Sequence, residues 1–267
     1  IRPTLTFNMS LLEELVSMKR WIAACGLAWL FTGAAAAADA DPLNSVRWPD
    51  LQREYLADAP VSFDSRIEVL APKVAEDSMN VPVTIRVKGL PDVKRVLVVV
   101  DFNPIVKVLD FHPLMAQPGL SFRIKLQQAS PVRALVQTGD GRWLAGGAWV
   151  DAAGGGCTAP STGRGAPDWA QKLNQVQGRV WKDGQNQRLR LRIMHPMDTG
   201  LAPGIPAFFI EQLAVVDDKG APMLQLETFE PLSENPVFSF DRLIWQDALR
   251  VVGRDNNGNR IDAKVLP

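Results

Sequence analysis

The chain has 267 residues, and its 29 basic and 29 acidic side chains balance to a formal net charge of zero at neutral pH. No charge excess favours nucleic acid or an anionic membrane as a partner. The only histidines, His112 and His195, have no further histidine or cysteine at metal-ligand spacing, which argues against a zinc or haem site. We therefore expect no metal and no cofactor.

Residues 1–38 have the features of a secretory signal peptide with further residues ahead of it. Residues 18–20 form a basic start, residues 21–31 are apolar, and residues 34–38 are small, as at a cleavage site. The apolar run is too short for a transmembrane helix, so we expect no membrane span. The segment predicts an exported, periplasmic protein. Residues 1–17 are either sequence upstream of a misplaced start or part of a longer basic region.

Strand signals dominate residues 45–151. A short helix is expected first, because Trp48, Leu51 and Tyr55 share one helical face. Alternation or β-branched apolar runs then predict strands at 81–87, 93–102, 120–126, 132–137 and 143–150. The strands are short and have no long amphipathic helices between them. This pattern favours an antiparallel β-sandwich over an α/β sheet.

Residues 152–167 have the composition of a linker and contain Cys157. Three glycines come directly before the cysteine: Gly154, Gly155 and Gly156. They predict a flexible arm that carries an exposed thiol. Cys25 lies in the apolar run of the signal segment, so its removal leaves Cys157 without an intramolecular partner. An odd cysteine in an oxidising compartment indicates an intermolecular bridge or a reactive thiol.

Residues 168–267 again read as strands. The expected ranges are 177–181, 188–194, 208–216, 223–229, 244–252 and 261–265. A second β-sandwich fits this spacing. The sequence therefore predicts an all-β protein of two β-sandwich domains joined by a Gly-rich linker.

The sequence lacks the common patterns of catalytic sites, with no nucleophile elbow, no closely paired cysteines and no His-Glu-x-x-His string. Gly154-x-Gly156-x-x-Ala159 matches a dinucleotide-binding pattern, but Pro160 and Gly163 argue against the helix that this pattern requires. We expect no catalytic residues and no enzyme activity of the chain's own.

Five strings relate the two halves to a known family. The first half contains Val69-Leu-Ala-Pro72 and Val81-Pro-Val83, and its last strand leads into Gly155-Gly-Cys157. The second half contains His195-Pro-Met-Asp-Thr-Gly200 and Glu230-Pro-Leu-Ser-Glu-Asn-Pro236. In these strings the chain resembles SoxYZ, the sulfur-carrier complex of bacterial thiosulfate oxidation, with both subunits fused.

The resemblance implies two immunoglobulin-like sandwiches and a cysteine on a glycine arm that carries a sulfur substrate between periplasmic redox enzymes. Carried over, Cys157 is the attachment site and the three glycines are the arm. In the family the arm ends the chain, whereas here Thr158 and Ala159 follow and a second domain continues. A thiol tethered on both sides must enter a partner as a loop, which is wider than a free end.

Fused carriers of this kind are also similar to a group associated with quinoprotein dehydrogenases, which use PQQ. Three hypotheses follow from the sequence. The first is a periplasmic carrier that holds a sulfur intermediate on Cys157 and presents it to partners such as Sox-type cytochromes. The second is a non-catalytic docking module for a quinoprotein dehydrogenase. The third is a homodimer linked through Cys157.

Overall fold

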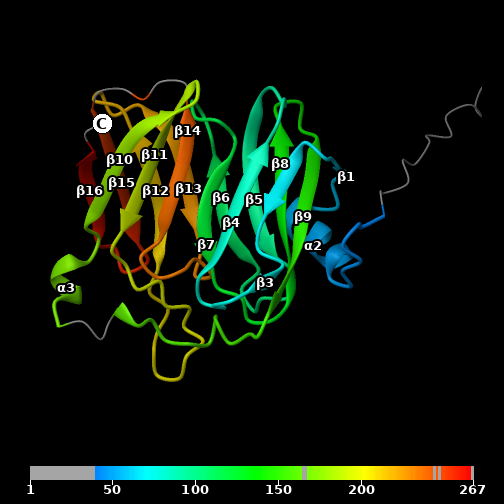
Figure 1. Ribbon diagram of the computed structural model, residues 1–267, viewed down its shortest axis with the longest axis horizontal. Coiled ribbons are helices and arrows are strands. Elements are labelled where there is room, and N and C mark those ends of the chain that lie inside the picture. The colour runs from blue at the N-terminus through cyan, green and yellow to red at the C-terminus, as the bar shows by residue number, and fades with distance from the viewer. Residues whose placement is uncertain (1–39, 164–166, 243–244, 246–247, 266–267) are drawn as a thin grey trace, which may run out of the picture. The chain divides into compact units, whose positions relative to one another are not determined.

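The fold consists of two stacked β-sheets (Figure 1). The computed structural model describes residues 40–163, 167–242, 245 and 248–265, so the predicted signal segment, residues 1–38, lies outside the described residues. One sheet has 10 strands and the other has 6, which confirms the all-β prediction. Within the described ranges, no helix has both the length and the apolar character that crossing a membrane requires.

The first half begins with a short helix and continues in strands. Of its expected apolar face, Trp48 and Leu51 are buried and Tyr55 is partly buried, and Leu56 is buried as well. The elements of this half are α2 (Trp48–Leu56), β1 (Val61–Phe63), β2 (Ile67–Leu70), β3 (Val74–Ala75), β4 (Val81–Val87), β5 (Val93–Val100), β6 (Lys107–His112), β7 (Leu120–Ile124), β8 (Ser130–Thr138) and β9 (Trp143–Ala152).

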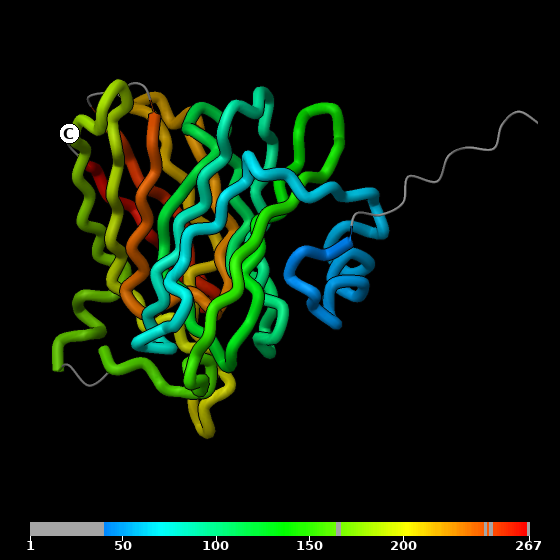
Figure 2. The backbone as a smooth tube through the Cα atoms, turned by 45° about the vertical axis from the view of Figure 1, so that its right-hand side comes forward, coloured from blue at the N-terminus to red at the C-terminus, as the bar shows by residue number. Residues whose placement is uncertain are grey.

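Residues 96–100 of β5 are buried on both faces of the strand, which explains the apolar run over these positions. Val96 and Val98 face the core between the sheets, whereas Leu97 and Val99 pack with Leu51 of α2 in a second, smaller cluster. Helix α2 therefore covers the part of the outer surface of the 10-stranded sheet that the first half forms. In Figure 2 this helix, in blue, lies beside the first half and away from the C-terminal end.

The second half contains α3 and the remaining strands. Its elements are α3 (Trp169–Lys172), β10 (Val176–Asp183), β11 (Asn186–Ile193), β12 (Ile210–Val216), β13 (Pro222–Thr228), β14 (Val237–Arg242), β15 (Leu249–Asp255) and β16 (Arg260–Val265). Strand β15 starts later than the expected range 244–252, part of which lies outside the described residues. The expected set lacks β1, β2, β3, β6 and β14. Of these, β6 and β14 join the halves.

Both sheets run through both halves of the chain. In the 10-stranded sheet β6 pairs with β13, so that Phe111 lies opposite Leu226. In the 6-stranded sheet β7 pairs with β14, so that Leu120 lies opposite Phe240. One buried apolar cluster contains residues of both halves. The two sandwiches thus join edge to edge into one double layer, and burial of this seam contributes to holding the halves together.

Candidate functional site

The segment that follows β9 lies against the first half instead of extending into solvent. We call residues 153–162 the cysteine segment. The backbone N–H of Gly154 donates to Ser78 Oγ over 3.1 Å, that of Gly155 to the Gln127 carbonyl over 3.1 Å, and that of Gly156 to the Leu126 carbonyl over 3.0 Å, three contacts that fix the run in place. The glycine run Gly154, Gly155 and Gly156, for which the sequence predicts a flexible arm, is packed in this conformation.

The glycines permit close packing here. A Cβ atom on Gly156 would lie 2.1 Å from the carbonyl oxygen of Ser78, and one on Gly154 would lie 2.5 Å from that of Gln127. Gly154 also has a φ of +97°, which residues with a Cβ rarely adopt. The glycine run therefore packs closely against neighbouring backbone because its residues have no side chains. Its composition alone indicates a mobile segment.

Cys157 is buried with 0% of its surface exposed, so the predicted exposed thiol is wrong for this conformation. Its Sγ lies 3.7 Å from the carbonyl oxygen of Lys125, to which it donates. Burial raises the pKa of the Cys157 thiol to about 11, although Lys125 lowers it in part. At pH 7 such a thiol is ionised in only about one molecule in ten thousand. In this conformation the sulfur is neutral and covered.

Residues 195–200, the His-Pro-Met-Asp-Thr-Gly string, form a capping loop over the cysteine segment. Thr199 Oγ1 donates to the carbonyl oxygen of Cys157 over 2.5 Å. Asp198 Oδ1 accepts from the backbone N–H of Ser161 over 3.0 Å. The second half of the chain thus encloses the cysteine of the first half, a contact that the string in the sequence does not predict.

His195 supports the capping loop from within the second half. Its Nδ1 accepts from the backbone N–H of Met197 over 3.1 Å, and its ring centroid lies 4.5 Å from that of Phe208. Its Nε2 lies 3.6 Å from Asp255 Oδ2. The histidine is buried, and its contacts are those of a side chain that shapes the loop. His112 lies on β6, where its Nε2 is 3.5 Å from Asp110 Oδ1.

Lys125 is a buried cation beside the thiol, with 1% of its surface exposed. Its Nζ donates to the carbonyl oxygen of Met197 in the capping loop. Burial lowers the pKa of the Lys125 ammonium, and four acidic groups nearby offset part of that effect: Asp198, Cys157, Glu234 and Glu230. Lys125 directly follows β7, and alternation in the expected strand 120–126 puts it on the outer face. Its burial therefore becomes visible only once the second half is packed against it.

The other string of the second half, residues 230–236, closes the same region from another side. The backbone N–H of Lys125 donates to the Pro231 carbonyl over 2.7 Å, and Ser233 Oγ donates to the Met79 carbonyl over 2.7 Å. Both strings therefore contact elements that hold Cys157. Among the residues that the structure describes, no group of histidine, cysteine or carboxylate side chains is arranged to hold a metal ion.

Comparison with protein families matches the two halves separately. Residues 52–157 match SoxY, described as sulfur oxidation protein SoxY, and residues 178–265 match SoxZ, described as sulphur oxidation protein SoxZ. Cys157 is the last residue of the first match. No curated protein matches the chain at the significance required.

Solved structures with similarity to parts of the chain include two proteins. The sulfur carrier protein SoxY from Chlorobium limicola f. thiosulfatophilum has 23% identity and a TM-score of 0.36, with 39% of this chain and 90% of that chain covered. A putative superoxide reductase from Thermotoga maritima has 15% identity and a TM-score of 0.31, with 36% of this chain and 96% of that chain covered. Both scores are low, so neither likeness supports a conclusion about function.

Proposed function

With a SoxY domain followed by a SoxZ domain, the chain belongs to the fused SoxYZ-type proteins of sulfur oxidation, and we propose that it carries a sulfur intermediate covalently on Cys157. One observation carries this proposal. The cysteine that ends the SoxY match is enclosed by the capping loop of the SoxZ match, through the hydrogen bond from Thr199. The two domains together thus form the environment of one thiol, which is the expected arrangement if that thiol is the working group.

Loading requires the cysteine segment to leave its packed position, because the covered sulfur is out of reach of a substrate. The segment must break the hydrogen bonds of its glycines and the one from Thr199. In solvent the pKa of the thiol returns to its ordinary value of 9.0, which gives a larger thiolate fraction at neutral pH. Coupling the thiolate to the terminal sulfur of a sulfur-bearing anion forms one S–S bond and releases two electrons. An electron-accepting partner of the cytochrome class takes up these electrons.

The periplasm is the proposed location, with Sox-type redox enzymes as partners. The support is the signal-like composition of residues 1–38, together with the need for an oxidising environment in which a sulfur adduct persists. The chain itself contributes a thiol and docking surfaces, and its partners perform the redox chemistry.

Intact mass of the exported protein, purified without reductant, tests the carrier proposal. We expect a mass increase of one sulfur-containing group that disappears on reduction and is absent from Cys157→Ser. The Cys157→Ser variant should keep its thermal midpoint, because serine fits the space of cysteine. An unmodified wild-type protein, or an adduct that persists in the variant, would contradict the proposal.

The buried thiol favours a second candidate, a docking module for a quinoprotein dehydrogenase in which Cys157 has no chemical role. In this candidate Cys157 stays neutral and buried, as observed, and the cysteine segment does not have to open. In this case Cys157→Ser would leave dehydrogenase activity intact, whereas deletion of the whole protein would lower it. A homodimer bridged by Cys157 needs both sulfurs exposed, and it would appear on non-reducing gels as a band of doubled mass.

A further inference from the structure

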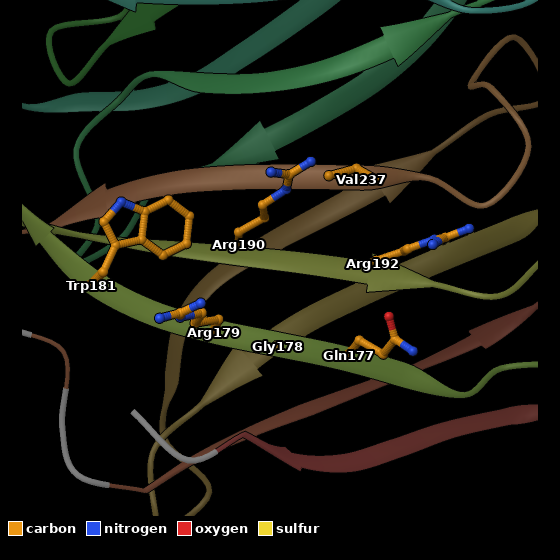
Figure 3. A pocket seen from close by; sticks show the side chains of 7 residues that line it. All are labelled: Gln177, Gly178, Arg179, Trp181, Arg190, Arg192 and Val237. Atoms are coloured by element: carbon orange, nitrogen blue, oxygen red, sulfur yellow. The ribbon is translucent and has the colours of Figure 1, made fainter.

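The outer surface of the 6-stranded sheet carries a cluster of arginines on neighbouring strands (Figure 3). Arg190 and Arg192 lie two residues apart on β11, and Arg179 of β10 is paired directly opposite Arg190. Arg123 of β7 lines the same groove beyond Val237 of β14. We call these four exposed arginines the arginine face.

The alternation of β11 produces this arrangement. Leu189 and Leu191 are fully buried in the core, so the residues between and after them, Arg190 and Arg192, point to solvent. The same alternation directs Arg179 outward from β10. The arginine face is therefore a regular consequence of strand geometry, with the guanidinium groups held above one rigid sheet.

The charges of the arginine face are not neutralised by the fold. Arg188, on the same strand, pairs with Asp241 over 2.7 Å and with Asp183 over 2.7 Å. Within the described part of the chain, none of the four arginines of the face has an ion-pair partner. Like charges directly opposite each other, as in Arg179 and Arg190, destabilise a sheet. An unbalanced positive cluster of this kind is suited to an anionic partner.

Two adjoining hollows form one groove along this face. The first has a volume of about 640 Å³ and contains Trp181, and the second has about 400 Å³ and reaches Thr162. Both hollows are lined by Arg190 and Arg192. Thr162 belongs to the cysteine segment, and its backbone N–H donates to Glu234 Oε2 over 2.7 Å. The groove therefore ends at the segment that carries Cys157.

Two carboxylates lie at this end of the groove, and both already accept hydrogen bonds from the chain. Asp77 Oδ1 accepts from the backbone N–H of Met79 over 2.8 Å, and Glu234 accepts from Thr162. The hollow that they share with Arg123, Arg190 and Arg192 still has an excess of positive charge. The other hollow has three arginines and no acidic residue in its lining.

We propose that the arginine face is the docking surface of an acidic partner protein, which it holds beside the cysteine segment. The inference rests on the proposed function in one respect, namely that this partner exchanges its group with Cys157. Charge complementarity identifies the partner by its chemistry, and the exposed ring of Trp181, at 36% of its surface, adds an aromatic contact. Tryptophan and arginine are the residues most enriched at interface hot spots.

The dimensions of the face favour an acidic protein surface over a single small anion. Alternate residues on a strand lie about 7 Å apart and neighbouring strands about 5 Å apart, so four strands span about 14 Å. An ion of sulfate size covers only a part of such a grid. An extended acidic chain presents a carboxylate at every second residue with the same repeat of about 7 Å, and it can therefore engage Arg190 and Arg192 together.

Binding of an acidic peptide to the purified protein tests the proposal. The probe is a fluorescein-labelled alternating Glu-Ser peptide of about twelve residues, long enough to cross the grid, and a Gln-Ser peptide of equal length is its control. We expect saturable binding of the Glu-Ser peptide by fluorescence anisotropy at low ionic strength, weakened at least tenfold by Arg190→Gln/Arg192→Gln. The matched variant Arg86→Gln/Arg260→Gln removes two exposed arginines outside the groove and should weaken binding less than about twofold.

The outcomes separate this proposal from its rivals. Equal weakening in both double variants would overturn it, because net charge alone would then explain the binding, and so would no binding by the wild-type protein. Full displacement of the peptide by equimolar sulfate would assign the groove to a small anion instead. Retention on phosphatidylserine vesicles without peptide binding would assign it to a membrane. Loss of the mass adduct on Cys157 would contradict the proposed function and leave the peptide result standing.

Discussion

The cysteine segment and the arginine face lie at neighbouring positions and differ in every physical respect. Cys157 is fully buried, uncharged and hydrogen-bonded from both halves of the chain. Arg190 and Arg192 are exposed, and their side chains have no ion-pair partner among the described residues. The comparison shows that the thiol, which is suited to covalent chemistry, is buried, whereas the arginine side chains, which are suited to binding a partner, are exposed. A partner that binds the face first would be in place when the segment opens.

The largest expected effect concerns the protection of the thiol. Iodoacetamide should alkylate Cys157 in the native protein at least about a hundredfold more slowly than in urea, because reaction requires opening of the segment. Mass spectrometry over time measures both rates. Equal rates in the native protein and in urea would show that the thiol is exposed, as the glycine-rich sequence predicts. The difference in burial between Cys157 and the arginine face would then not exist.

The pH dependence of the alkylation rate tests the burial of Cys157 in a second way. The pKa of Cys157 is raised to about 11 in the packed state, from an ordinary value of 9.0. The packed state is therefore fully stabilised below pH 9 and loses stability as pH rises toward 11, by about 3 kcal/mol in total. We expect the alkylation rate to keep rising well beyond pH 9. A plateau near pH 9 would contradict a buried thiol.

Alanine substitutions of two neighbouring glycines distinguish packing from mobility. Gly156→Ala places a Cβ 2.1 Å from the Ser78 carbonyl, whereas Gly155→Ala meets nothing within 4 Å and has only its φ of +80° against it. We expect Gly156→Ala to speed alkylation of Cys157 at least about thirtyfold and Gly155→Ala less than tenfold. A flexible arm would respond equally to both substitutions, so equal rates would contradict the packed segment.

Removal of the Thr199 hydroxyl tests the hydrogen bond by which the second half holds the cysteine segment. Thr199→Val deletes the hydrogen bond to the Cys157 carbonyl. A net loss of about 1 kcal/mol should speed alkylation about fivefold. Thr84→Val is the matched control, because its Oγ1 bonds Ser121 on the 6-stranded sheet and away from the segment. An equal increase of the alkylation rate in the two variants would indicate a general loss of stability instead of a specific effect of the bond from Thr199.

The sequence predicts much of this fold because strand periodicity is a local property. The alternation of 81–87 and the apolar run of 93–102 correspond to β4 and β5. It does not predict the joined sheets, because the pairing of β6 with β13 depends on residues more than a hundred positions apart. The family strings identify Cys157, but not its burial.

The error at Cys157 has a physical cause. Glycine-rich sequence permits both a mobile arm and a close approach to another backbone, and composition does not distinguish the two. The choice depends on the carbonyls of Leu126 and Gln127, which accept from the segment. The sequence does not predict the burial of Lys125 for a similar reason, because this residue, directly after β7, is covered by the capping loop of the second half.

The smallest expected effect is on stability and concerns two arginines of one strand. Arg188 has two carboxylate partners, whereas Arg190 lies opposite Arg179. We expect Arg188→Gln to lower the free energy of unfolding by about 0.5–1 kcal/mol, and Arg190→Gln to leave it unchanged or raise it by about 0.5 kcal/mol. Urea unfolding of both variants measures these changes. If Arg190→Gln destabilised the fold as much as Arg188→Gln, the arginine would serve the sheet itself, and its exposure would no longer indicate an acidic partner.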